Sequence, residues 1–293
     1  MVKGEKFTKY LAKFDKVFIQ QKLNEGLTIR MISPIVEVPE RRLGEMVEYF
    51  DLSVTNKSST HIVNHKYFDE IDSEEKAYFL GFLVADGCVT KDVRKSGFLS
   101  KRITFCNSVQ DKEIIEKFRD VVCPTVKINW KNNSTDTITR RDQASFKFTS
   151  EHMFDTLVGK YGIVERKTHD LTFKLPDLGG FMRHFIRGFM DGDGHVRRNQ
   201  ISFIFTSKDF MNQVSDYFEN KLFTTRYNVI KGKTVDYYRH YVNMSKVNIQ
   251  EMYVILYADA SVYLERKRVV FESEITNRYN LELPIIDNLK NLT

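Results

Sequence analysis

The sequence predicts an α+β protein built as a pseudo-twofold pair of similar halves, preceded by a small all-helical module. Three observations support this prediction: one short segment occurs twice, alternating apolar and polar residues follow each copy, and helix-length apolar patterns lie between. Each half is predicted to follow the order αββαββα. With 293 residues, the chain is long enough for two such domains and a small module.

The repeated segment occupies residues 79–87 (FLGFLVADG) and 186–194 (IRGFMDGDG). In each copy an apolar run carries small residues four apart and ends in Asp-Gly. Residues four apart share one face of a helix, and small residues let two helix backbones approach closely. We therefore expect a helix–helix interface formed by Gly81, Ala85, Gly188 and Gly192.

Each copy ends in an acid, Asp86 or Asp193, at the negative end of its helix dipole, where a carboxylate costs about 0.3–1 kcal/mol. The glycine after each acid favours a left-handed C-cap. Two acids on two packed helices would concentrate negative charge, which Mg²⁺ could compensate through carboxylate oxygens and water. The alternative is two core helices that happen to stop at Asp-Gly, and the matched pattern of both copies argues against it.

The remaining elements of the two halves are predicted from periodicity and turn residues. In the first half, Asp72 and Glu75 predict a capping box before the first helix, and strand residues follow Gly87. Further strands are expected over 102–106, 125–129 and 145–149, helices over 110–121 and 151–160, and a loop over 132–142. In the second half, strands are expected over 195–198, 200–206, 226–231 and 237–245, and helices over 208–221 and 247–257.

The N-terminal section, residues 1–52, is predicted to be helical and to resemble a helix-turn-helix over residues 26–43. Pro34 falls inside its second helix, where proline removes a hydrogen bond, and Glu37 takes a turn position usually given to glycine. The third helix would carry Arg41 and Arg42. Two interpretations stay open at this point: a helical module that contacts DNA, or a helical decoration packed on the core.

The predicted parts of the chain are residues 1–52, a linker over 53–65, domains over 66–170 and 171–280, and a tail over 281–293.

Composition and charge limit the classes of function that the chain can have. The formal charge is +6, divided as −2 over residues 1–75 and +8 over residues 76–293, which fits a polyanionic partner of the repeat region. Three cysteines without paired spacing indicate neither a disulfide framework nor a zinc motif. No apolar run approaches about 18 residues, so we expect an intracellular protein in a reducing compartment, not secreted and not in a membrane.

Polar and basic residues mark one face of the predicted strands. Taken alone, such a face is more often the solvated side of an antiparallel sheet. Beside two acids that hold metal, it is better explained as a saddle for the DNA major groove, where such side chains reach base edges. The candidate DNA contacts are Lys127, Asn129, Lys147, Arg197, Arg226, Arg239, Tyr241 and Asn243, with Arg41 and Arg42 of the N-terminal section.

The two motif copies, together with two further segments, resemble the LAGLIDADG homing endonucleases in their single-chain, two-motif form. Residues 161–168 (YGIVERKT) and 256–267 (LYADASVYLERK) look like the segments that close the two domains of that family. Val84 replaces the first acid of the first motif, whereas Asp191 keeps it in the second. The resemblance covers roughly residues 66–275.

This resemblance implies a site-specific endonuclease that hydrolyses phosphodiesters in both strands of a long asymmetric DNA target and leaves short 3′ overhangs. It implies two or three Mg²⁺ ions between Asp86 and Asp193, with the backbone of Ala85 and Gly192 as further ligands. It also gives a catalytic role to the lysine of each closing segment, Lys167 and Lys267. Double-stranded DNA would be the partner of a monomer that needs no other protein.

Two other functions share this resemblance. Some relatives joined to a helix-turn-helix are non-catalytic transcription regulators, and retention of both Asp86 and Asp193 argues against that function here. Others are intron RNA maturases, which only an assay with nucleic acid distinguishes.

Overall fold

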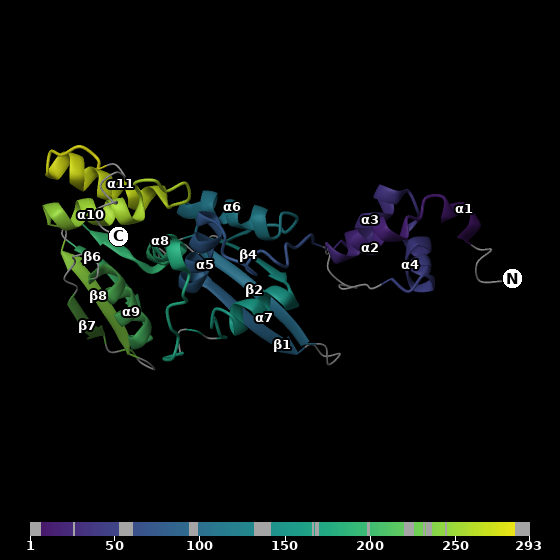
Figure 1. Ribbon diagram of the computed structural model, residues 1–293, viewed down its shortest axis with the longest axis horizontal. Coiled ribbons are helices and arrows are strands. Elements are labelled where there is room, and N and C mark those ends of the chain that lie inside the picture. The colour runs from purple at the N-terminus through teal and green to yellow at the C-terminus, as the bar shows by residue number, and fades with distance from the viewer. Residues whose placement is uncertain are drawn as a thin grey trace, which may run out of the picture. The chain divides into compact units, whose positions relative to one another are not determined.

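The computed structural model describes residues 7–25, 27–52, 61–93, 99–131, 142–165, 167, 170–197, 200–219, 226–230, 232, 236–243 and 245–284. The chain forms two compact units, which Figure 1 shows with their elements labelled. The first unit contains residues 1–65 with 119–127, and the second contains residues 66–118 with 128–293.

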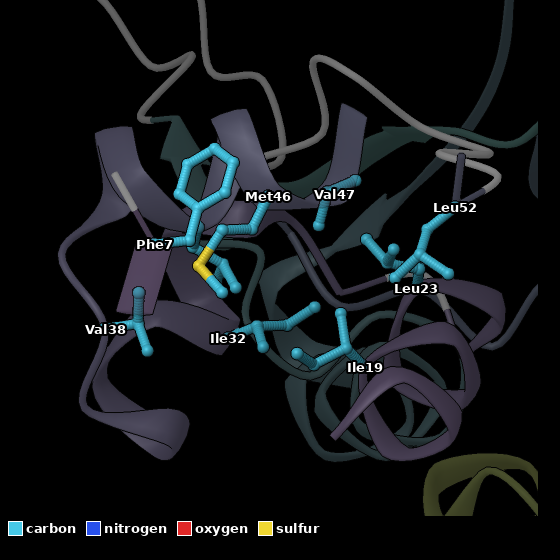
Figure 2. Packing of buried hydrophobic residues seen from close by; sticks show 9 residues of the cluster. Phe7, Ile19, Leu23, Ile32, Val38, Met46, Val47 and Leu52 are labelled. Atoms are coloured by element: carbon cyan, nitrogen blue, oxygen red, sulfur yellow. The ribbon is translucent and has the colours of Figure 1, made fainter. Parts of the chain in front are cut away.

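The first unit is helical and has its own apolar core. Its helices are α1 (Thr8–Leu11), α2 (Lys16–Asn24), α3 (Ile29–Val36) and α4 (Glu40–Tyr49). The Asp15 side chain caps α2 by accepting from the N–H groups of Val17 and Phe18, and Thr28 caps α3. Figure 2 shows the buried residues gathered between the helices. They are Phe7, Ile19, Leu23, Ile32, Val38, Leu43, Met46, Val47 and Leu52.

The turn between α3 and α4 lies within residues 26–43, the segment that was expected to resemble a helix-turn-helix. Pro34 lies inside α3, and Glu37 adopts a left-handed conformation with φ of 53°. The turn is closed by Ser33, whose hydroxyl donates to the Val38 carbonyl at 2.7 Å and whose carbonyl accepts from the Val38 N–H at 3.2 Å. These helices were expected, whereas a DNA contact by this unit stays a prediction.

The second unit contains two halves with the same element order and confirms the predicted fold class. The first half has α5 (Glu74–Asp86), β1 (Gly87–Val93), β2 (Leu99–Ser108), η2 (Val109–Asp111), α6 (Lys112–Val122), β3 (Asn129–Lys131), β4 (Gln143–Thr149) and α7 (Glu151–Gly159). The second has η4 (Gly179–Phe181), α8 (Met182–Asp193), β5 (His195–Arg197), β6 (Gln200–Phe205), α9 (Lys208–Glu219), β7 (Arg226–Ile230), β8 (Tyr237–Asn243) and α10 (Lys246–Leu256). Helix α11 (Glu265–Ser273) and the π-helical turn η5 (Glu274–Arg278) follow.

Both halves build a four-stranded antiparallel sheet, ordered β1-β2-β4-β3 and β5-β6-β8-β7. Figure 1 labels β1, β2 and β4 of the first sheet and β6, β7 and β8 of the second. Aromatic side chains fill the space between each sheet and its helices. Phe118 stacks on Phe79 and also contacts Phe105 of the first sheet. In the second half, Phe203 of β6 stacks on Phe218 of α9. No helix in the described ranges is long and apolar enough to cross a membrane.

A predicted strand and a predicted helix cap are wrong. The strand expected over 125–129 is a turn followed by a shorter strand, β3, because Pro124 ends α6 and the Val126 N–H donates to the Cys123 carbonyl at 3.0 Å. The first motif helix begins one residue later than the capping box suggested. Its cap is Ser73, whose hydroxyl accepts from the Lys76 N–H.

Some predicted segments lie partly outside the described residues. These are residues 53–60 of the linker, 132–141 of the loop and 285–293 of the tail. The described end of the linker is bonded within the first unit, where the Ile62 N–H donates to the Thr125 hydroxyl at 2.8 Å and the Asn64 N–H to the Val122 carbonyl at 2.9 Å.

Helices α5 and α8 pack with their backbones in contact. A Cβ on Gly81 would lie 2.0 Å from the carbonyl oxygen of Phe185, and one on Gly188 would lie 2.0 Å from that of Tyr78. One turn further on, a Cβ on Gly192 would lie 2.3 Å from the Cβ of Ala85. The structure therefore places all four small residues of the two motifs between these helices.

The glycines after the two acids are not left-handed caps, contrary to the sequence expectation. Gly87 and Gly194 are extended, with φ of −83° and −69°, because the chain enters a strand directly after each helix. Both still need to be glycine. A Cβ would lie 2.6 Å from the Leu83 carbonyl oxygen at the first position and 2.4 Å from that of Met190 at the second.

An ion pair between the buried Arg187 and the partly buried Glu74 joins the two halves near the start of α5. Arg187 of α8 is fully buried, and its guanidinium donates to Glu74 Oε1 at 2.6 Å and to the carbonyls of Val262 and Leu256 at 2.9 Å. Glu74 Oε1 also accepts from the N–H groups of Ser261 and Val262. This carboxylate therefore pairs with a charge of the second half and also accepts hydrogen bonds from the backbone of the loop before α11.

We expect Gly81→Ala and Gly188→Ala each to lower the free energy of unfolding by about 1–3 kcal/mol, because the new methyl group meets a backbone carbonyl that cannot move alone. Gly159→Ala is the control, since its methyl group would meet no described atom within 4 Å and alanine favours a helix by about 1 kcal/mol. Urea unfolding measures all three. Equal stability of the Gly81 and Gly159 variants would contradict the close helix contact.

We expect Glu74→Gln to lower the free energy of unfolding by about 3 kcal/mol, because it leaves the Arg187 charge buried without a counter-charge. The matched control is Glu151→Gln, which neutralises an 80% exposed partner of Lys101 and should change stability by less than about 0.5 kcal/mol. Chemical denaturation of both variants is the measurement, and similar losses would show that the Arg187 pair contributes no more than a surface pair.

Candidate metal and nucleic-acid site

The helix pair brings the two motif acids to the same place. Asp86 is the last residue of α5, and Asp193 is the last residue of α8. A Cβ on Gly192, the neighbour of Asp193, would lie 2.9 Å from Asp86 Oδ2. The absence of a side chain at this position therefore lets one carboxylate lie against the end of the other helix.

Keeping both buried acids ionised is unfavourable, because burial and their mutual repulsion disfavour the charged forms. Burial and then the charge of Asp193 raise the pKa of Asp86 to about 7. Burial likewise raises the pKa of Asp193. The ammonium groups of Lys167 and Lys267 act in the opposite direction on both acids. A divalent cation between the carboxylates would stabilise their ionised forms further.

The two closing-segment lysines reach the ends of the motif helices. The amine of Lys167 donates to three carbonyls in the last turn of α5, those of Leu83 at 2.9 Å, Ala85 at 2.7 Å, and Val84 between them. The amine of Lys267, which is 5% exposed, donates to the carbonyls of Met190 at 2.7 Å and Gly194.

This arrangement offsets the negative ends of both helices beside the acids. Burial lowers the pKa of Lys167 and of Lys267 to about 8 in each case. The backbone carbonyl of Ala85, expected to bind metal, already accepts a hydrogen bond from Lys167. The predicted backbone ligand Gly192 lies in the last turn of α8, next to Asp193.

Three residues of the site were not predicted from the sequence. Asn107, at the end of β2, donates from Nδ2 to Asp86 Oδ2 at 3.0 Å. Arg266 of α11 makes a two-point contact with the buried Asp111, at 2.6 and 2.8 Å. Asn107 is the penultimate residue of β2 and lies one residue beyond the predicted end of that strand, which is a weak signal. The Arg266–Asp111 pair joins residues from different halves and has no local signal.

Asp191, the first acid of the second motif, lies away from the solvent and is fully buried. Its carboxylate accepts from the hydroxyls of Tyr78 at 2.9 Å and Tyr257 at 2.7 Å, and from the Leu264 N–H at 2.7 Å. The contacts come from α5, the end of α10 and the start of α11. Burial raises the pKa of Asp191, and the charge of Lys267 and these three donors oppose that rise.

The strand register places four candidate DNA contacts, Asn129, Lys147, Arg239 and Tyr241, on the sheet face that turns away from the helices. Asn129 pairs with Ser145, two residues before Lys147, and all three share one face. In the second sheet the pairs are Arg226 with Tyr241, Ile204 with Arg239, Gln200 with Asn243 and Arg197 with Gln200. The opposite face carries the buried Ile201, Phe203 and Val242.

The accessibility of these residues varies. Asn129 and Lys147 are exposed, and Arg239 and Tyr241 are partly buried. The side chains of Arg197, Arg226 and Asn243 lie outside the described part of the chain. Lys127 is exposed but precedes β3 rather than lying on a strand. Arg41 and Arg42 belong to α4 of the first unit, where both pair with Glu45.

The donor set fits a magnesium ion. Mg²⁺ in proteins is commonly held by one or two carboxylates, with water and substrate phosphates as the other ligands. Asp86 and Asp193 supply two such carboxylates. Within the described residues no cluster of three or more histidine, cysteine, aspartate or glutamate side chains could hold a metal.

Three solved structures are similar to this chain at low identity. A structure of I-DmoI in complex with DNA and Mn has 14% identity and a TM-score of 0.43, covering 64% of this chain and 98% of its own. I-AabMI bound to uncleaved DNA has 12% identity and a TM-score of 0.45, covering 73% and 95%. I-SmaMI bound to an uncleaved DNA target with calcium has 12% identity and a TM-score of 0.44, covering 74% and 96%.

No curated protein matches the chain at a significant level. The sequence model of the LAGLIDADG-like domain matches residues 180–253, which include α8 and the whole second sheet. The first half repeats that element order and sheet topology and contributes the other helix of the pair. The chain is thus similar to the LAGLIDADG-like domain over one of its two halves.

Proposed function

We propose that this protein is a site-specific DNA endonuclease, a metal-dependent phosphodiester hydrolase. The observation that carries the proposal is the pair of carboxylates, Asp86 and Asp193, at the adjoining ends of two helices whose backbones touch. The match of residues 180–253 to the LAGLIDADG-like domain and the basic balance of residues 76–293 support a nucleic-acid substrate. Its partner would be double-stranded DNA, bound by a monomer.

The site would hold Mg²⁺ between Asp86 and Asp193, and we propose two or three ions, as the family resemblance implies. When bound, the metal would lower the pKa of an attacking water and offset the charge that develops on phosphate. Asn107 holds one oxygen of Asp86, which orients the carboxylate. Lys167 and Lys267 add positive charge beside the acids, where it would favour the transition state.

The two sheets would bind the DNA through the faces that carry Lys147 and Asn129 in the first half and Arg239 and Tyr241 in the second. Because the two faces differ in sequence, the proposed target is asymmetric. Because each half supplies one acid and one lysine, the proposed product is a double-strand break, and the family resemblance implies short 3′ overhangs.

The decisive experiment is a cleavage screen of the full chain against a randomised DNA library with Mg²⁺, with a chelator as the blank. Cut products with a shared sequence are the expected result. Selective binding without cutting would instead favour a transcription regulator. Splicing assistance to an intron RNA without DNA cutting would favour a maturase.

We expect Asp86→Asn and Asp193→Asn each to abolish double-strand cleavage, with a loss of at least about 10³-fold in rate, while DNA affinity changes little. The amide keeps the side-chain shape and removes the charge that holds metal. Asp216→Asn, on the exposed side of α9, is the control and should cut normally. Single-turnover cleavage and filter binding on the same target are the measurements, and full cutting by both site variants would refute the metal role.

We expect the double variant Arg41→Ala and Arg42→Ala to shorten the protected DNA at one end if the first unit contacts DNA. Both arginines lie on α4, and Arg41 has an 88% exposed side chain. Lys22→Ala on α2, which also removes a cation paired with a nearby glutamate, is the control. Footprinting at matched concentrations is the measurement. An unchanged footprint would leave the first unit as a helical decoration.

A further inference from the structure

Asp191 connects the second motif helix to the helix that carries Lys267. Its carboxylate accepts from the Leu264 N–H at 2.7 Å, and Leu264 is the residue immediately before α11. The Leu264 side chain offers no cap for this helix, so Asp191 supplies the acceptor at its start. One turn later, the Lys267 N–H donates to the Leu264 carbonyl at 3.0 Å.

These contacts close a ring. From α11, the Lys267 amine returns to α8 and donates to the Met190 and Gly194 carbonyls on either side of Asp191 and Asp193. The ring runs from Asp191 through Leu264 and Lys267 back to the helix that carries Asp191. Movement of α11 along or away from α8 would break both ends of it, so the position of the amine depends on the carboxylate.

Within the residues that the structure describes, the first half shows no such ring. Val84 takes the place of Asp191, two residues before the motif acid, and its side chain cannot accept a hydrogen bond. The segment before Lys167 is instead held by Glu165, whose carboxylate accepts from the Lys91 N–H, and by the Tyr161 hydroxyl, which donates to the Phe68 carbonyl at 2.9 Å. The two lysines thus bind equivalent carbonyls at the helix ends, but different residues hold their segments in place.

We propose that Asp191 is a positioning residue that fixes Lys267 at the end of α8, and that this control acts on only one of the two halves. The role for Lys267 in cutting rests on the proposed function, whereas its placement by Asp191 does not. Loss of Asp191 should therefore release Lys267 and leave Lys167 in place, and it should slow the cutting of one DNA strand.

The first test needs no activity. The full chain is treated with an amine-modifying reagent, and mass spectrometry follows Lys267 with Lys167 as the internal reference. In Asp191→Val, which copies the first half, Lys267 should react at least about 10-fold faster than in the unmodified sequence, because local opening exposes it. Lys167 should change by less than about twofold.

Two further variants separate positioning from general loss of stability. Asp191→Asn keeps an oxygen for the Leu264 N–H and should restore much of the protection, which also serves if Asp191→Val does not fold. Tyr257→Phe removes one donor from Asp191 and leaves the Leu264 contact, so stability should fall while the ratio of Lys267 to Lys167 labelling stays unchanged. Equal acceleration of both lysines, or of neither, in the Asp191 variants would overturn the proposal.

The second test resolves the two strands of a cleaved target in single-turnover reactions. Asp191→Val should slow, by about 10-fold, the same strand that Lys267→Met slows, with unchanged DNA affinity. A normal rate for both strands in Asp191→Val, beside a slow strand in Lys267→Met, would overturn the positioning role. Selective release of Lys267 with no effect of Lys267→Met on either strand would support the placement and refute the lysine's part in the proposed function.

Discussion

The backbone contact between α5 and α8 is the constraint on which the rest of the second unit depends. At Gly81 and Gly188 the space for even one methyl group is already occupied by a carbonyl oxygen of the other helix. This contact fixes the position of each helix along the axis of the other, because packed backbones have less freedom to slide than packed side chains. Asp86 and Asp193, the last residues of the two helices, therefore lie close together. Lysines from two distant segments bind beside them.

The parts of this structure that the sequence predicted are those with a local or repeated signal. The motif helices, both sheets and the helices of the first unit follow from periodicity, capping residues and the repeat. Residues 125–129 alternate as a strand does, but only Asn129 belongs to a strand, because the Val126 N–H donates to the Cys123 carbonyl in the turn after α6. Gly87 and Gly194 are required because a Cβ would collide with a carbonyl oxygen of the preceding helix, not because the backbone is left-handed. A sequence alone does not distinguish these two reasons.

The polar contacts of the site were harder to foresee, because they join segments that are distant in the chain. Arg266 and Asp111 are 155 residues apart, and Lys167 is 84 residues from the first carbonyl it binds. These charged residue types are common on protein surfaces, so the sequence does not indicate which of them are buried together in the folded chain. The resemblance identified both lysines from their shared context, although it did not reveal their hydrogen bonds to the helix ends.

Glu74 and Arg187 carry a consequence for how this chain can be divided or recombined. The carboxylate belongs to one half and the guanidinium to the other, and the loop at Ser261 and Val262 uses the same oxygen. A half joined to a half from a related protein would bury a charge between the halves without its counterpart. A functional chimera must therefore inherit the acid, the base and this loop as one unit, and the symmetry of the fold hides that requirement.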